Sequence, residues 1–139
     1  MNESNVGMKE AGGTSRGFTL IELMVAVAVV AIIAMIAIPS YTSQMVKGRR
    51  SSAEAALLDV AQRQQQYLLD VRSYAPNVAT LNTTIPVNVS AYYTIAIAPV
   101  AGPPPSFIAS ATPIAGTAQA GDVVLTIDNT GAKTPAGAW

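Results

Sequence analysis

Glu22 is the charged side chain with the most unusual surroundings in this sequence, because it lies inside an otherwise apolar run from Phe18 to Ile38. The run has 21 residues, and Thr19 is its only other polar member. As a helix it would be about 32 Å long, close to the ~30 Å hydrocarbon thickness of a bilayer. A carboxylate in lipid is costly and by default has a cationic partner. Glu22 could therefore pair with a cation of a neighbouring molecule, or it could simply favour the positive end of its own helix in a plain membrane anchor.

The composition limits the chemistry available to the rest of the chain. Its 139 residues include no cysteine and no histidine, which excludes thiolate nucleophiles, disulfides, histidine-based catalysis and the usual zinc ligand sets. After residue 17 the chain has six cations and six acids, so the totals give no electrostatic footprint for nucleic acid. The acids near the C-terminus, Asp122 and Asp128, both flank a predicted strand. We therefore expect no enzyme, no cofactor and no metal site.

The stretch Gly17–Glu22, with the sequence Gly-Phe-Thr-Leu-Ile-Glu, resembles the processing site of type IV prepilins. The resemblance extends to about Arg50 and implies cleavage after Gly17 by a prepilin peptidase, followed by N-methylation of Phe18. It also implies that Glu22, the fifth residue of the mature chain, neutralises the N-terminal amine of a neighbouring subunit. Residues 1–17 would then be a cleaved leader, and their composition, rich in Gly, Asn and Ser, indicates disorder.

One long helix, predicted over residues 18–73, must position these residues. Residues 18–39 would form its transmembrane and filament-core half. Residues 40–139 would form its amphipathic half together with an exposed globular domain. Pro39 removes a backbone hydrogen bond and clashes with the preceding turn, so we expect a kink or a locally melted segment near residues 36–40.

Beyond Gly48 the helix is predicted to be amphipathic, with apolar residues at i, i+3, i+4 and i+7 and Gln64 as an interruption. This stripe should pack against a sheet, and its members are Ala53, Ala56, Leu57, Val60, Ala61, Tyr67, Leu68 and Val71. Leu58 and Leu69 fall outside the stripe and are candidates for contacts in a filament.

Four charged residues of this helix have the i, i+4 spacing of ion pairs, namely Arg50 with Glu54 and Asp59 with Arg63. Such a pair adds a few tenths of a kcal/mol at most. We interpret these charges as solvated or subunit-facing rather than as parts of a site.

After the helix the sequence predicts a loop over residues 76–91 and then a small antiparallel sheet. Three segments rich in strand formers and a short fourth segment are expected to form it, over residues 92–98, 107–112, 122–128 and 132–134. Residues 99–105 include three consecutive prolines, so they are predicted to be a hairpin connector that cannot pair in a ladder. The expected fold class is α+β, with one long helix packed on three to four antiparallel strands.

The end of the chain, Leu125–Trp139, resembles the tail of PilE-type minor pilins. Those proteins usually carry one cysteine just before the final tryptophan and another before the third strand. Here the matching places hold Ala138 and roughly Asp122. The resemblance therefore implies the type IV pilin fold without its disulfide, and we expect Trp139 to dock against the sheet edge by packing alone.

The sequence and the resemblance together predict a structural subunit of the minor class. It would assemble into a type IV pilus through its N-terminal hydrophobic helix and support pilus biogenesis, adhesion or twitching motility. A pseudopilin of a type II secretion system shares the N-terminal region and remains an alternative. A DNA-receptor pilin of a competence pilus ranks lower, because Lys133 is the only cation after Arg72.

The expected partners are other pilin subunits, the prepilin peptidase that also acts as methyltransferase, the pilus assembly platform and the inner membrane. Nucleic acid is not expected. The chain would first be a single-pass inner-membrane protein and later part of a cell-surface pilus. Cations lie on both sides of the apolar run, so its cytoplasmic N-terminus is implied by the peptidase and not by the positive-inside rule.

Overall fold

The computed structural model describes residues 17–139, where the residues up to Ile38 belong to one unit and residues 39–139 form a second. The first helix, α1 (Leu20–Val71), has 52 residues and extends through both units. It is long and apolar enough to cross a membrane, and none of its most apolar window is buried. The helix predicted over residues 18–73 is therefore confirmed to within two residues at each end.

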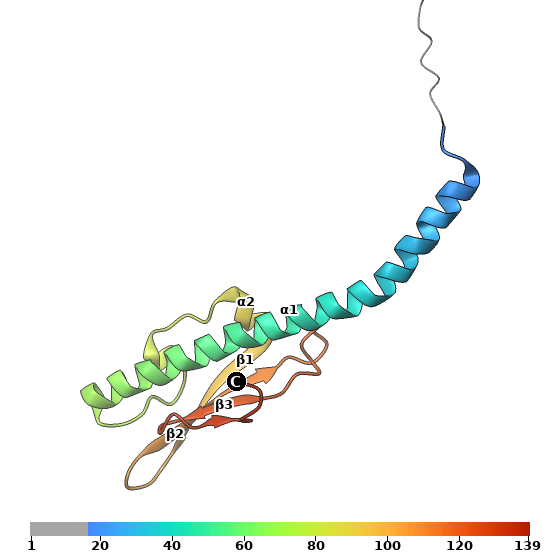
Figure 1. Ribbon diagram of the computed structural model, residues 1–139. Coiled ribbons are helices and arrows are strands. Elements are labelled where there is room, and N and C mark those ends of the chain that lie inside the picture. Colours follow the sequence, from blue (N-terminus) through green and yellow to red (C-terminus); the bar gives the residue numbers. More distant parts are fainter. Residues whose placement is uncertain (1–16) are drawn as a thin grey trace, which may run out of the picture. The chain divides into compact units, whose positions relative to one another are not determined.

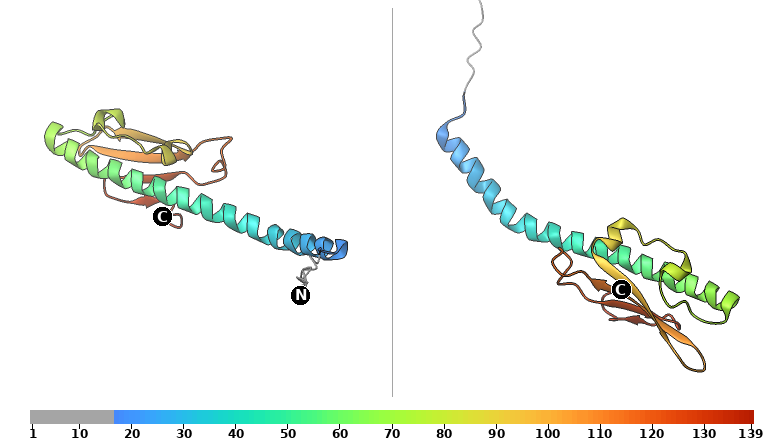
Figure 2. Two further views of the ribbon diagram at one scale, coloured as in Figure 1. Left: turned by 90° about the horizontal axis from the view of Figure 1, so that it is seen from above. Right: turned by 180° about the vertical axis from the view of Figure 1, so that it is seen from behind.

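The second unit contains a four-stranded antiparallel sheet with the strands in chain order (Figure 1). Its strands are β1 (Tyr93–Val100), β2 (Ser106–Pro113), β3 (Leu125–Asp128) and β4 (Lys133–Thr134). Within this unit the sheet lies along one side of α1 in all three views (Figures 1 and 2). The α+β fold class predicted from the sequence is confirmed.

The core forms where the inner face of the sheet meets α1. The register places the fully buried Ala111 of β2 between Ile95 of β1 and Leu125 of β3. Small residues on the central strand leave room for the larger side chains of its neighbours and of the helix. The buried apolar residues are Ala53, Ala56, Leu57, Val60, Ala75, Leu81, Val89, Tyr93, Phe107, Ala109, Ala111, Leu125 and Ile127.

Gln64 does not interrupt the buried stripe of α1 but belongs to it. Its side chain is fully buried, Nε2 donates to the backbone oxygen of Ala75 at 2.9 Å, and Oε1 accepts from the nitrogen of Ala75 at 2.8 Å. This pair of hydrogen bonds fixes the chain where it turns back after α1. The prediction for Val71 was wrong, because its side chain is 51% exposed at the end of the helix.

The loop predicted over residues 76–91 contains two short helices, η1 (Ala79–Leu81) and α2 (Val87–Ser90). Pro99 was expected to lie outside the ladder, but it pairs in register with Phe107 at the end of β1. Proline is tolerated there because β1 is an edge strand of the sheet formed by the described residues.

The strand expected over residues 122–128 begins only at Leu125. The backbone nitrogen of Asp122 closes a turn on Gln119, and its carboxylate is held by α1 and β1. The chain therefore reaches the sheet three residues later than its strand propensity suggests. At the other end, Trp139 is half-buried against the core, as expected for a docked tail. The prediction that it docks by packing alone was wrong, because its Nε1 also donates to the oxygen of Thr134 at 3.1 Å.

Candidate assembly and processing site

The start of α1 is capped by its own sequence. Thr19 precedes the helix. Its Oγ1 accepts a hydrogen bond from the backbone nitrogen of Glu22 at 3.2 Å, and its carbonyl oxygen accepts one from the backbone nitrogen of Leu23 at 3.2 Å. The pattern Thr-x-x-Glu is that of a capping box, with Thr19 as N-cap and Glu22 three residues later. The cap fixes Glu22 in the first turn, where the helix dipole favours a negative charge.

The three residues that the sequence assigned to processing and assembly lie together. Gly17, Phe18, Thr19 and Glu22 line one open hollow of about 450 Å³. Phe18 is 84% exposed, so the bond between Gly17 and Phe18 is accessible in the described part of the chain. A Cβ atom added at Gly17 would meet no atom within 4 Å, so packing among residues 17–139 does not require glycine there.

Glu22 forms no ion pair among residues 17–139, where the salt bridges are Arg50–Asp122 and Arg63–Asp59. Cleavage before Phe18 would create an ammonium group four residues before Glu22 in the sequence, on the non-helical segment that leads into α1. The geometry therefore allows a pairing of Glu22 either with the amine of its own chain or with that of a neighbour.

Pro39 lies inside α1, and the helix continues through it without a break. Its carbonyl oxygen accepts a hydrogen bond from Oγ1 of Thr42 at 2.9 Å. The chain therefore shows no melted segment at residues 36–40, and a kink at Pro39 in the assembled state stays a prediction.

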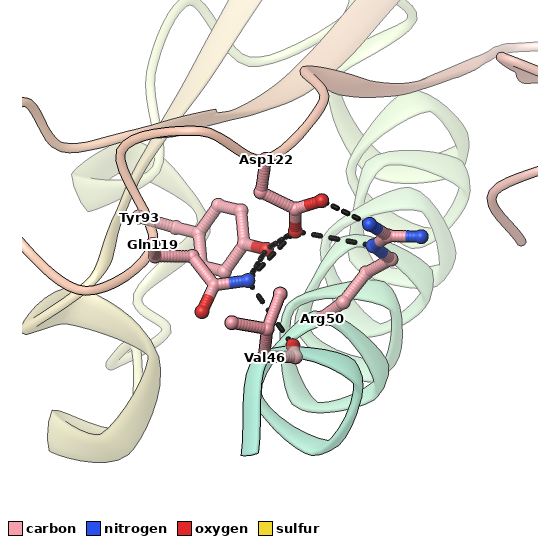
Figure 3. A network of polar contacts seen from close by, with 5 residues as sticks. All are labelled: Val46, Arg50, Tyr93, Gln119 and Asp122. Atoms are coloured by element: carbon pink, nitrogen blue, oxygen red, sulfur yellow. Dashed lines mark hydrogen bonds and ion pairs between the residues drawn. The ribbon is translucent and has the colours of Figure 1, made fainter. Parts of the chain in front are cut away.

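A second group of polar residues, which the sequence did not single out, joins α1 to the sheet through Asp122 (Figure 3). Arg50 donates Nε to Oδ2 of Asp122 at 3.1 Å and Nη2 to Oδ1. The hydroxyl of Tyr93 also donates to this carboxylate. The Asp122 side chain is only 1% exposed, so this is a buried carboxylate neutralised by an arginine from another element.

Gln119 completes this network. Its Nε2 lies 2.7 Å from Oδ2 of Asp122, 2.7 Å from the hydroxyl of Tyr93 and 3.1 Å from the oxygen of Val46 on α1. Its Oε1 points away from Asp122 (Figure 3) and has no hydrogen-bond partner among residues 17–139. The opposite amide orientation would bring oxygen against a carboxylate and a carbonyl, so the network itself selects this one.

The contacts of this network displace the pKa values of its members. Burial alone would raise the pKa of Asp122, but hydrogen bonds from Arg50, Tyr93 and Gln119 outweigh it and lower that pKa to about 2. Burial and the neighbouring carboxylate raise the pKa of the Tyr93 phenol. The hydrogen bond to Asp122 raises the pKa of Arg50. Asp122 is therefore an anion at all ordinary pH values and serves as a structural anchor.

The sequence predicted a different partner for Arg50. The i, i+4 spacing allowed a pair with Glu54, but Arg50 binds Asp122, a residue 72 positions away, so the interpretation of Arg50 as solvated or subunit-facing was wrong. The pair between Arg63 and Asp59 is confirmed, with Nε and Oδ2 2.8 Å apart. The spacing of charges within one helix identifies local pairs, but it carries no signal for a carboxylate brought in by the fold.

Comparison with known proteins adds four findings. Residues 39–123 match the model of a family described as type IV minor pilin ComP, DNA uptake sequence receptor. Residues 13–38 match the prokaryotic N-terminal methylation motif. Over 67 residues the chain is 36% identical to the type IV wide pilus major component PilA4 of Thermus thermophilus. This match covers 48% of the chain and 51% of that protein, so the chain spans about half the length of the curated relative.

The fourth finding concerns the fold. A type IV pilin from Shewanella oneidensis, solved at high resolution, has a TM-score of 0.53 and 24% sequence identity. The match covers 68% of this chain and 97% of that chain. At this identity the likeness shows the fold alone, and it confirms the pilin fold predicted from the sequence.

Proposed function

Because the chain belongs to the type IV minor pilin family described as ComP, we propose that it is cut after Gly17, N-methylated at Phe18 and assembled into a pilus through its N-terminal helix. The family is one of structural pilins and not of enzymes. The chain is accordingly a structural pilus subunit, and the proposal concerns the residues and steps by which it becomes one.

One observation carries the proposal. The methylation motif matched over residues 13–38 coincides with a capped helix start at which Gly17, Phe18 and Glu22 line a single exposed hollow. A peptidase needs an accessible bond, and the bond between Gly17 and Phe18 lies outside the regular helix. The free space around Gly17 supports the idea that glycine is required by the peptidase and not by the fold.

Glu22 would act in assembly. In the membrane its carboxylate lacks a cation among the described residues, and the amine of a methylated Phe18 would supply one. If that amine belongs to a neighbouring subunit, the pair recruits the next subunit and sets its depth. Before assembly α1 would hold the chain in the inner membrane with its N-terminus in the cytoplasm, and an assembly platform would then extract it into the filament.

The mass of the natural product tests this proposal. Protein extracted from membranes or from sheared pili should lack residues 1–17 and carry one added methyl group, located on Phe18 by tandem mass spectrometry. A product that begins at Met1, or beyond Ser40, would contradict it.

The family description favours DNA binding as a second candidate function, although the sequence ranked it low. Two cations stack on aromatic rings in the second unit, Arg49 at 4.1 Å from the ring centre of Tyr92 and Lys133 at 4.7 Å from that of Trp139. Cations beside aromatic rings can contact phosphates and bases. Sheared pili should then retain labelled duplex DNA, and Arg49→Ala with Lys133→Ala should lower retention relative to Arg63→Ala. Equal retention by wild-type and by pilin-free samples would exclude a receptor role.

A further inference from the structure

A hollow lies between α1 and the loop that carries η1 and α2. Its volume is about 460 Å³, within the range of roughly 300–1,000 Å³ that is typical of small-molecule sites. Its lining residues all belong to the second unit. Ala55 and Ala56 of α1 leave the space open, and Ile85 and Pro86 of the loop add further apolar surface. We call this space the α1–loop hollow.

Three polar side chains of the α1–loop hollow contact one another. Oδ2 of Asp59 accepts hydrogen bonds from Nε of Arg63 at 2.8 Å and from Oγ1 of Thr83 at 3.2 Å. Oδ1 of Asp59 and both Nη atoms of Arg63 form no hydrogen bond among residues 17–139. The Arg63 and Asp59 side chains are 40% and 50% exposed, so a ligand can reach them. The hollow therefore offers an available acceptor beside available donors, and their mutual contacts hold them in place.

The fold depends little on these polar groups. An ion pair as exposed as that of Arg63 with Asp59 contributes little to stability. Asn82 and Asn88 also line the hollow, and their side chains form no hydrogen bond among residues 17–139. The hollow therefore combines apolar surface with more polar groups than folding uses, which is the composition of a ligand site.

A neutral compound with several hydroxyl groups matches this site better than an ion does. An anion would meet the carboxylate of Asp59, and a cation would meet the guanidinium of Arg63. A hydroxyl group both donates and accepts hydrogen bonds. Of two adjacent hydroxyls, one can therefore donate to Oδ1 of Asp59 while the other accepts from an Nη of Arg63. A sugar ring carries such pairs of hydroxyls, and its C–H groups can pack on Ala55 and Ile85.

A peptide fits the α1–loop hollow less well than a sugar. Extended peptides commonly gain their main-chain hydrogen bonds from an exposed strand edge. Within residues 17–139, the hollow is lined by α1, α2 and the loop between them rather than by a strand. It therefore offers side-chain donors and acceptors but no backbone ladder.

We propose that the α1–loop hollow binds one neutral sugar ring of a saccharide, with Asp59 and Arg63 holding two adjacent hydroxyls. Asn82 and Asn88 supply amides for further hydroxyls of the ring. The site lies within the second unit, so binding requires neither cleavage after Gly17 nor assembly into a pilus. A failure of the pilus function and a failure of sugar binding are therefore separate results.

Saturation-transfer difference NMR on the full chain in dodecylphosphocholine micelles tests the site, because this detergent carries no sugar. The probes are the methyl glycosides of glucose, galactose, mannose and N-acetylglucosamine, and at least one should give ring-proton signals with the wild-type chain. Asp59→Asn should weaken its binding about tenfold or more, since the variant removes a charged acceptor. Ala55→Gln should abolish binding by filling the hollow. The controls Asp70→Asn and Ser51→Gln place the same new side chains at exposed positions of α1 outside the hollow and should bind as wild-type.

Circular dichroism shows whether each variant keeps its fold, and if only one of Asp59→Asn and Ala55→Gln is folded, that variant decides alone. Binding of none of the four glycosides, undiminished binding by a folded variant of the hollow, or an equal loss in the controls would overturn the sugar site. Two further probes give the competing results. Glucose 6-phosphate that binds more tightly than methyl glucoside, or tri-alanine that binds where no glycoside does, would show that the hollow takes an anion or a peptide instead.

Discussion

Arg50 and Asp122 lie 72 positions apart in the chain, yet they form a bidentate ion pair that connects α1 to the loop before β3. The carboxylate is almost completely buried and the guanidinium is 25% exposed. The ion pair therefore fixes the segment before β3 against α1.

Removing Arg50 should destabilise the second unit strongly. Arg50→Met leaves a buried, uncompensated carboxylate, for which the expected loss in free energy of unfolding is about 3 kcal/mol. Arg63→Met is the matched control, because the Arg63–Asp59 pair is 40% and 50% exposed and should contribute less than about 1 kcal/mol. Urea unfolding of a soluble chain beginning at Pro39 measures both, and equal losses would contradict the role of Asp122.

The same network should make stability depend on acid pH. The pKa of Asp122 is lowered to about 2 in the folded chain, so its contribution is present above the ordinary pKa near 4 and is lost as the pH falls from 4 toward 2. The expected loss is about 2 kcal/mol. Hydrogen bonds from Thr130 and backbone groups also lower the pKa of the exposed Asp128, so the comparison of wild-type with Asp122→Asn isolates the buried group. If the free energy of unfolding of wild-type and Asp122→Asn changed with pH in the same way between pH 4 and pH 2, the acid dependence would not come from Asp122.

Replacing Gln64 should lower the free energy of unfolding more than replacing its exposed neighbour Gln65. Gln64→Ala leaves both backbone groups of the buried Ala75 without partners, and the expected cost is about 2 kcal/mol or more. Gln65→Ala removes one exposed hydrogen bond to the oxygen of Asn129 and should cost less than about 1 kcal/mol. Thermal unfolding of the two variants measures the difference. A Gln64→Ala protein that is as stable as Gln65→Ala, or more stable, would contradict the role of Gln64.

Gly17→Val should block maturation without affecting the fold. No atom lies within 4 Å of a Cβ added at Gly17, so thermal stability should be unchanged while the leader is retained. Gly48→Ala also meets no atom within 4 Å, and it should be processed normally and gain up to about 1 kcal/mol from its helical position. Immunoblots resolve the two chain lengths, and a fully processed Gly17→Val protein would refute the assigned cleavage site.

Glu22→Val should insert into the membrane as well as wild-type but fail to enter pili. The variant removes the costly charge from the apolar run and also removes the partner of the Phe18 amine. Membrane fractionation and immunoblots of sheared pili separate the two effects, with Glu22→Asp as the control that keeps the charge. Wild-type amounts of Glu22→Val in pili would show that Glu22 is dispensable for assembly.

Local patterns in the sequence determined the elements. The apolar run with the lone Glu22 specified the start of a long helix, the 3.6-residue period specified which side of α1 is buried, and alternating strand formers specified β1 and β2. These features depend on neighbours within a few residues, so hydrophobic periodicity and capping chemistry suffice to predict them. Gly131, with φ of +83°, lies in the turn between β3 and β4, where glycine adopts a positive φ without strain.

Only the tertiary structure decided which polar groups are buried together. Gln64, Arg50 and Asp122 look like surface residues in a one-dimensional pattern, because long-range partners leave no trace in local spacing. Folding brings the buried backbone groups of Ala75 next to Gln64 and the buried carboxylate of Asp122 next to Arg50. Because buried polar groups need hydrogen-bond partners, these contacts then fix the positions of the side chains. By taking Arg50 away from Glu54, the fold also determines which charges of α1 stay available to another molecule.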